Sequence, residues 1–173
     1  GSLAQRNVVT RTTLNRFLDA MSGEAYKVFD INLRQHFYTM EVLKDSLVRC
    51  NLLKLNDEEL VILSELLELS EKSIEGKCWE MMKRFDLKVL ILTCGKQGSY
   101  VFSGDTRSFL DTPHVKVVDT VGAGDSFTAA FCAAILKGKS MVEAHRLAVE
   151  VSAFVCGQAG AMPRLPEKLK GIL

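Results

Sequence analysis

Apolar residues recur along the chain at two spacings, and the alternation of these spacings predicts helices and strands in turn. Intervals of three and four residues indicate an amphipathic helix, whereas strict alternation and short continuous apolar runs indicate strands. The helical spacing predicts helices at 10–21, 39–48, 56–67, 73–85, 125–137 and 141–156. Strand patterns occur at 28–33, 52–55, 88–93, 99–102, 107–110 and 115–118.

Strands that alternate with helices favour an α/β fold, in which a mostly parallel sheet is flanked by helices on both faces. The run at 88–93 is almost wholly apolar, which is typical of a strand buried on both sides. In such sheets, ligands bind beyond the carboxyl ends of the strands. The sequence contains no internal repeat, low-complexity tract or linker, so we treat 1–173 as a single domain. Gly1 and Ser2 are interpreted as a cloning scar.

The segment 119–127, D-T-V-G-A-G-D-S-F, joins an extended β-branched run to an apolar helical pattern. Glycines at 122 and 124 allow a sharp turn and a close approach to a bound group, because no Cβ intervenes. The first amides of the following helix have no intrahelical partner and carry the positive end of the dipole, so they suit an anion such as phosphate. Asp125 lies in that first turn, where a carboxylate is stabilised as the anion and is available to accept a proton.

Two further groups of polar residues follow strands, and each allows two interpretations. Asp30, Asn32 and Arg34 share one face of the 28–33 strand, which is either the wet side of an edge strand or the lining of a cleft. Asn56 suits an N-cap and the acids after it suit the helix dipole, so Glu59 needs no role beyond capping. Neither group identifies a ligand by itself.

The composition is that of an ordinary globular protein with a formal net charge of +1. This charge gives no electrostatic reason to expect a nucleic acid or a membrane surface as partner. No apolar run approaches the roughly 18 residues of a membrane span, and the start lacks a signal-peptide pattern. Five widely spaced cysteines fit reduced, buried thiols and a cytoplasmic protein better than disulfides or a zinc site. His36, His114 and His145 are isolated and are interpreted as surface or structural residues.

Several familiar catalytic motifs are missing from the sequence. Residues 122–127 lack the third glycine of a dinucleotide fingerprint, and Gly95-Lys96 is followed by Gln97, not by the Ser or Thr of a P-loop. Protein-kinase, serine-hydrolase and zinc-protease signatures are also missing. What remains is a glycine-built anion site with a carboxylate beside it. Such a site suits phosphoryl transfer to an alcohol, which needs dipoles, a base and a divalent metal on the nucleotide.

The segment 119–127 resembles the second signature of the ribokinase-like, or PfkB, family of carbohydrate kinases. Four other stretches resemble motifs of that family and occur in family order over almost the whole chain. They are N-x-x-E at Asn56 and Glu59, D-x-N-x-R at 30–34, T-x-G-x-x-G at 93–98, and the tail near the adenine and monovalent-cation sites at 160–163.

The resemblance implies a ribokinase-like, Rossmann-like fold and ATP-dependent phosphorylation of a sugar, with Mg²⁺ and in some members K⁺. Asp125 would deprotonate the sugar hydroxyl. The amides of Gly122, Ala123 and Gly124 would hold the charge of the transferring phosphoryl group. The other implied roles are nucleotide binding by Asn56, Thr93, Gly95 and Gly98, a water-mediated magnesium contact by Glu59, a monovalent-cation site at the backbone of Asp119 and Val121, and sugar contacts by Asp30, Asn32 and Arg34.

Members of the family are longer, and this chain is similar to their carboxyl-terminal half, truncated on the amino-terminal side and without the small β lid. We therefore expect the chain alone to show little or no sugar phosphorylation and to self-associate through an exposed sheet edge. The 30–34 match favours a free hexose such as fructose as the acceptor. The alternatives are a nucleoside or sugar-phosphate kinase of the same superfamily, a noncatalytic nucleotide- or phosphate-binding module, and a structural domain with well-capped helices.

Overall fold

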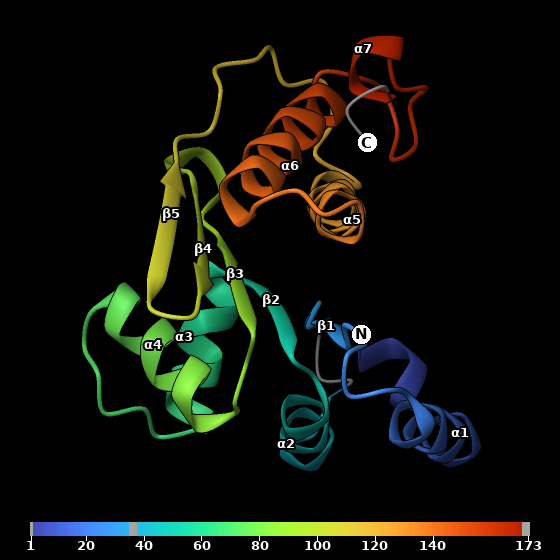
Figure 1. Ribbon diagram of the computed structural model, residues 1–173, viewed down its shortest axis with the longest axis vertical. Helices are drawn as coiled ribbons and strands as arrows, with labels where there is room; N and C mark the ends of the chain where they lie inside the picture. The colour runs from blue at the N-terminus through green and yellow to red at the C-terminus, as the bar shows by residue number, and fades with distance from the viewer. Residues whose placement is uncertain (1, 35–37, 171–173) are drawn as a thin grey trace. The chain divides into compact units, whose positions relative to one another are not determined.

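The computed structural model describes residues 2–34 and 38–170 and confirms the α/β class (Figure 1). The described residues form one sheet in the order β1-β2-β3-β4-β5, in which β1 and β2 are parallel. The strands are β1 (Val28–Asp30), β2 (Leu52–Asn56), β3 (Val89–Thr93), β4 (Ser99–Ser103) and β5 (Thr106–Leu110). The helices are α1 (Val8–Ala20), α2 (Met40–Arg49), α3 (Asp57–Leu66), α4 (Ile74–Arg84), α5 (Ala123–Leu136), α6 (Met141–Cys156) and α7 (Glu167–Lys170), with 3₁₀ turns η1 (Ser2–Gln5) and η2 (Gly95–Gln97).

The chain divides into two compact units, and each is described by itself. The first unit holds the residues up to Leu92 together with Phe102–Thr106, and the second holds Thr93–Val101 and the residues from Arg107 onwards. The segment 119–127 therefore belongs to the second unit. The motifs at 30–34 and 56–59 belong to the first.

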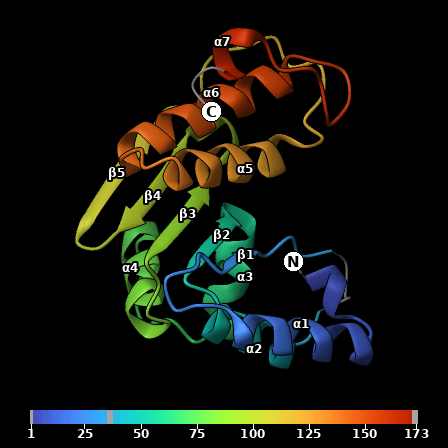
Figure 2. The same cartoon turned by 45° about the vertical axis from the view of Figure 1, so that its right-hand side comes forward.

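In the first unit, the helices begin where side chains cap them. Helix α1 starts at Val8, two residues before the predicted start, because the Asn7 side chain accepts a hydrogen bond from the Val9 amide at 2.9 Å. Helix α2 buries Val42, Leu43 and Leu47, as its spacing predicts. A hydrogen bond of 2.9 Å from the Asn15 side chain to Asp45 joins α1 to α2, and Figure 2 shows these two helices next to each other.

In the second unit, α5 and α6 lie side by side in Figures 1 and 2. Helix α5 buries Phe127 and Phe131, whereas α6 buries the small residues Ala144 and Ala148. Small side chains on one helix let the large rings of its neighbour pack between the two backbones. The pairing places α6 beside α5, the helix that follows the 119–122 turn.

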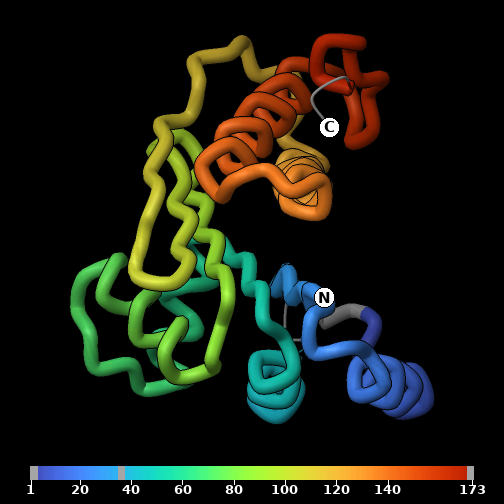
Figure 3. Tube along the Cα trace, in the orientation of Figure 1, coloured from blue at the N-terminus to red at the C-terminus, as the bar shows by residue number. Residues whose placement is uncertain are grey.

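Three sequence predictions of secondary structure and burial are wrong. Residues 115–118 form no strand; they belong to the long irregular connection between β5 and α5, which Figure 3 traces. Val117 and Val118 are more than half exposed there. Their β-branched side chains favour a strand, but a strand also needs a neighbouring strand to pair with. Strand β1 ends at Asp30, three residues early, because Asn32 adopts a φ of +48° that a strand cannot contain. The apolar spacing of the 73–85 helix also places Ile74 on its buried face, but Ile74 is 46% exposed at the start of α4.

The prediction that the cysteines are buried is confirmed for three of the five. Cys50, Cys78 and Cys94 are buried, and Cys132 and Cys156 are half-buried. Burial raises the pKa of the Cys50 thiol to about 12. Among the described residues, no helix has both the length and the apolar character required to cross a membrane. Gly1 and His36 lie outside the described residues.

Candidate active site

Gly122 forms the turn that precedes helix α5, and the position requires glycine. Its φ is +81°, in the left-handed region, and it occupies the N-cap position without any side chain that could cap the helix. A Cβ atom at residue 122 would stand 2.6 Å from the carbonyl oxygen of Ala161 and 2.9 Å from its Cα. Both the backbone angle and the packing against Ala161 therefore exclude a larger residue.

The first amides of α5 show which donors the turn offers. The first helical hydrogen bond runs from the Ser126 amide to the Gly122 carbonyl at 2.8 Å, so the helix geometry leaves Gly124 and Asp125 without an intrahelical acceptor. The Ala123 amide donates to the Thr120 carbonyl at 3.2 Å. Three amides are predicted to bind an anion, and that of Ala123 already has an acceptor. An anion would therefore share the Ala123 amide with the Thr120 carbonyl or replace that carbonyl as its acceptor.

Asp125 is the third residue of α5, and its side chain is exposed. Within the described part of the chain, no hydrogen bond or ion pair engages its carboxylate. The neighbouring amides and the helix dipole favour negative charge at this point. The carboxylate is thus exposed beside a helix start that no side chain caps.

Asp119 ties this turn to a second turn 41 residues later in the sequence. One carboxylate oxygen accepts the Val121 amide at 3.0 Å, and the other accepts the Gly160 amide at 3.2 Å. The bond from the Val121 amide, followed by that from Gly160, holds the pKa of Asp119 below its usual value. Sequence reasoning assigned only the backbone of Asp119 to a cation site and missed this role of the side chain.

The 93–98 turn follows strand β3 and lies in the same unit. The Cys94 amide donates to the Gly98 carbonyl at 2.9 Å, and Gly98 has a φ of +113°. A Cβ at Gly98 would lie 2.5 Å from the Leu110 carbonyl oxygen, so the second glycine of the motif is required where the turn meets the end of β5. The Thr112 hydroxyl donates to the Gly95 carbonyl at 2.6 Å, a contact that no sequence pattern indicated.

In the first unit, Asn56 and Glu59 form the capping box that their spacing allows. The Asn56 side chain accepts the Glu59 amide at 2.8 Å, and Glu59 Oε2 accepts the Asn56 amide at 2.9 Å. Glu59 Oε1 also accepts the amide of Leu33 at 2.9 Å. Glu59 is only 4% exposed, so its carboxylate is a buried link between the start of α3 and the chain that leaves β1.

The polar residues at the end of β1 are placed differently from one another. Asp30 lies opposite Lys54 of β2, and Lys54 Nζ is 3.3 Å from Asp30 Oδ1. Arg34 is exposed and its guanidinium donates to the Leu33 carbonyl at 3.3 Å. Sequence reasoning missed Lys54, because it lies inside an apolar strand and belongs to none of the quoted motifs.

The magnesium prediction can be compared with the donors present. Among the described residues, no three His, Cys, Asp or Glu side chains gather into a group that could hold a metal ion. Each Glu59 oxygen accepts one amide and keeps a second lone pair. The residues therefore fit a water-mediated contact with an ion that is held chiefly by nucleotide phosphates, which is the usual arrangement for Mg²⁺.

His145 of α6 belongs to a buried polar set with one serine of β4 and one of β5. Its Nε2 lies 2.8 Å from the Ser99 hydroxyl and its Nδ1 lies 2.9 Å from the Ser108 hydroxyl. Burial lowers the pKa of His145 to about 4, so the ring is neutral near pH 7. This confirms a structural role for His145; His114 is exposed.

Comparison with known proteins agrees with these motifs. The chain is 29% identical over 165 residues to a protein of Arabidopsis thaliana named probable fructokinase-3, an alignment that covers 88% of this chain and 46% of the relative. The chain thus spans about half the length of that curated relative.

Solved structures share the fold. A nucleoside kinase of Methanocaldococcus jannaschii, an archaeal member of the ribokinase family, matches with a TM-score of 0.75 and 25% identity over 91% of this chain and 51% of its own. The fructokinase of Vibrio cholerae O395, solved with fructose, ADP and calcium ion, matches with a TM-score of 0.82 and 24% identity over 99% of this chain and 58% of its own. The fold is therefore that of the ribokinase family.

A family model extends these similarities across most of the chain. The model described as pfkB family carbohydrate kinase matches residues 8–168, a range that includes every predicted site residue. The match also spans both compact units. This chain belongs to the pfkB family of carbohydrate kinases.

Proposed function

We propose that the whole protein transfers the γ-phosphoryl group of ATP to a hydroxyl group of a sugar, with a free hexose such as fructose as the acceptor. The observation that carries the proposal is the uncapped start of α5, where glycine at the N-cap leaves amides for an anion and an exposed Asp125 stands beside them. The family membership supports a kinase of this class.

In the proposed reaction, the oxygen of the sugar hydroxyl forms a bond to the γ-phosphorus while the bond from that phosphorus to the β–γ bridging oxygen breaks. Asp125 accepts the hydroxyl proton, and ADP leaves with the bridging oxygen. The amides of Gly122, Ala123 and Gly124 stabilise the charge on the transferring group. Such general-base assistance contributes a factor of about 10² to 10⁴ to the rate.

The proposed nucleotide and cation contacts fall to the remaining motif residues. Asn56, Thr93, Gly95 and Gly98 bind the nucleotide, and Glu59 contacts a magnesium ion through water. That ion would neutralise charge on the nucleotide phosphates. The backbone of Asp119 and Val121, fixed by the Asp119 carboxylate, offers a monovalent-cation site of the K⁺ type.

An acceptor panel with ATP and Mg²⁺ tests the proposal in the whole protein. We expect ADP release that depends on a hexose, with fructose among the active acceptors, and much slower or no release from the 173-residue chain alone, since substrate positioning supplies much of the rate. Turnover by the whole protein of nucleosides but not sugars would favour the alternative of a nucleoside kinase, which one structural relative exemplifies.

A noncatalytic nucleotide-binding module is the alternative from another class. Such a module would bind ATP with magnesium, measured by calorimetry, yet release no ADP with any acceptor. The kinase proposal requires both binding and acceptor-dependent turnover from the same preparation.

We also propose that the chain self-associates. Strand β1 lies at one end of the strand order, and Val28 on it is 41% exposed. Unpaired amides and carbonyls at a sheet edge pair readily with a second chain. Light scattering of the purified chain should therefore give a mass above 19.2 kDa, and a monomer would contradict the proposal.

A further inference from the structure

Lys54 is a lysine in the interior of a strand whose other residues are almost all apolar. It is 4% exposed, and it occupies the middle of β2 between Leu53 and Leu55, which are fully buried. Lysine is almost never fully buried unless its charge is paired. The pair is with Asp30, whose Oδ1 lies 3.3 Å from the lysine nitrogen.

The sheet register sets this pair. Asp30 and Lys54 are partners across the parallel β1–β2 ladder, so their side chains leave the same face of neighbouring strands. The Asp30 side chain is 16% exposed, although its Oδ1, the atom that faces Lys54, is buried. The lysine therefore holds the inner oxygen of a carboxylate whose outer part reaches the surface at the end of β1.

The chain after Asp30 is held at a second point. Asn32 has a φ of +48°, and the Leu33 amide donates to the buried Glu59 carboxylate at 2.9 Å. A non-glycine residue with positive φ costs energy, and it persists only when its surroundings fix it. The 30–34 segment is thus fixed by Lys54 at Asp30 and by Glu59 at Leu33.

Stability alone does not account for a charge at residue 54. Replacing a buried ion pair by well-packed apolar residues is often neutral or stabilising, because removing two charges from water costs more than their attraction returns. An apolar residue would also continue the pattern of β2. The ion pair is better explained by the orientation that it gives to the Asp30 carboxylate.

We propose that Lys54 is a positioning residue for the acceptor substrate: its ammonium group fixes Asp30 at the end of β1 so that the Asp30 carboxylate can accept hydrogen bonds from sugar hydroxyl groups. This inference rests on the proposed function, in which the 30–34 segment contacts the sugar. In this proposal, Lys54 acts on the acceptor through Asp30.

The test compares Lys54→Met, Lys54→Arg and Lys88→Met in the whole protein, assayed with its best acceptor. Lys54→Met should raise the acceptor KM about tenfold or more, with a smaller fall in kcat, and leave the KM for ATP within about twofold. Lys54→Arg keeps the charge on a longer, planar group and should lie between this variant and the wild type.

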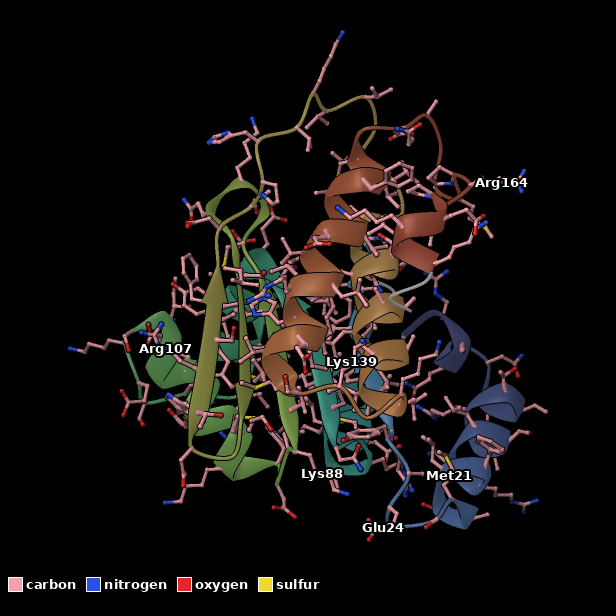
Figure 4. All side chains as sticks on the ribbon, turned by 45° about the horizontal axis from the view of Figure 1, so that its top comes forward. Met21, Glu24, Lys88, Arg107, Lys139 and Arg164 are labelled. Carbon is pink, nitrogen blue, oxygen red and sulfur yellow. The ribbon has the colours of Figure 1, made fainter. Side chains whose placement is uncertain are left out.

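Lys88 is the matched control. It is an exposed lysine of the same unit, directly before β3, and its ammonium group donates to the Gly23 carbonyl at 3.3 Å. Figure 4 shows it at the same end of this unit as Glu24. The same change from lysine to methionine at this position should leave both KM values unchanged.

A Lys54→Met variant with a lower melting temperature but an unchanged acceptor KM would overturn the proposal, because a purely structural lysine gives that result. An equal rise in both KM values would overturn it too. If the wild-type whole protein phosphorylates no acceptor, the proposed function fails, and amide hydrogen exchange decides the role of Lys54 separately. Exchange of the 31–34 amides should be about tenfold faster in Lys54→Met, with α4 unchanged, and equal exchange would overturn the proposal.

Discussion

Helices α3 and α5 both carry an acidic residue at their third position, yet the two carboxylates have opposite environments. Glu59 in α3 is buried and accepts two backbone amides, one of them from its own N-cap residue. Asp125 in α5 is exposed, and its N-cap is a glycine that caps nothing. The acidic residue at the third position thus caps the start of α3, whereas no side chain caps the start of α5.

Helix α6 shows that an acidic residue at the third position can cap a helix start without being buried. Its N-cap Ser140 and third residue Glu143 form a capping box on an exposed helix start, and hydrogen bonds from the Ser140 side chain and backbone lower the pKa of Glu143. In α3 and α6, the acidic residue at the third position therefore caps the helix start. The exception is α5, which lacks the cap at the point where the chain carries its most specific motif, and this difference supports the proposed site at the start of α5.

The largest expected effect is on catalysis. Asp125→Asn in the whole protein should lower kcat by about 10² to 10⁴ while nucleotide affinity changes little, because the amide keeps the shape of the side chain and cannot act as a base. Steady-state kinetics and ATP titration measure the two quantities. Glu143→Gln, the same kind of change at the third position of α6, is the control and should leave kcat unaltered. Equal losses in both variants would remove the distinction between the open and closed helix starts.

The next effect concerns the glycine that keeps α5 open. Gly122→Ala should lower the free energy of unfolding of the chain by about 2 to 4 kcal/mol, from left-handed backbone strain and a clash with Ala161. Gly160→Ala has almost the same φ, +78°, but open space around its Cβ, so about 1 to 2 kcal/mol of strain is expected. Urea unfolding of both variants gives the difference, and identical losses would mean that the contact with Ala161 is unimportant.

Acid should weaken the pairing of α5 with α6. His145 on α6 lies 6.0 Å from the Phe127 ring of α5 between centroids, and its pKa is lowered from 6.5 to about 4. The unfolded chain therefore binds a proton between these two pH values and the folded chain does not, so stability falls as the pH drops from 6.5 towards 4.

The loss of unfolding free energy between pH 6.5 and 4 is at most about 3.4 kcal/mol, at 1.36 kcal/mol for each unit of pKa. His145→Gln should flatten this part of a plot of melting temperature against pH. An unchanged slope in that variant would show that other groups cause the acid sensitivity.

The smallest effect compares the two capping boxes. Glu59→Gln should lower the free energy of unfolding by about 1 to 3 kcal/mol, because one buried amide of the Leu33 and Asn56 pair loses a charged acceptor. Glu143→Gln, at an exposed box, should cost no more than about 1 kcal/mol. Thermal unfolding of the two variants checks the order, and a larger loss at Glu143 would reverse the assignment of Glu59 as the more deeply embedded carboxylate.

The sequence predicts those helices and strands well whose start or buried face depends only on residues close together in the chain. The capping box at Asn56, the buried face of α2 and the buried run of β3 all follow from spacing of a few residues. Residues 115–118 fail because a strand also needs a partner, and no local pattern reveals whether one is present.

The candidate site divides in the same way. Segment 119–127 is identified from nine consecutive residues, and the structure adds two reasons why residue 122 must be glycine, namely its left-handed backbone angle and its contact with Ala161. Lys54 could not be selected from the sequence, since its significance comes from a register partner 24 residues away. Contacts between distant residues are thus the part that periodicity and motif spacing leave out.

The contacts of Asp119 also determine when this region can complete its folding during synthesis. Its second amide partner, Gly160, and the wall that Ala161 provides are synthesised about 40 residues after the turn that they support. Helix α5 can begin to coil as soon as it emerges, but the turn in front of it acquires its final shape only after α6 and the following loop have been translated. The 119–122 turn is therefore among the later parts of this chain to reach its final shape during synthesis, and a stall between α6 and Gly160 would leave it without its contacts to Gly160 and Ala161.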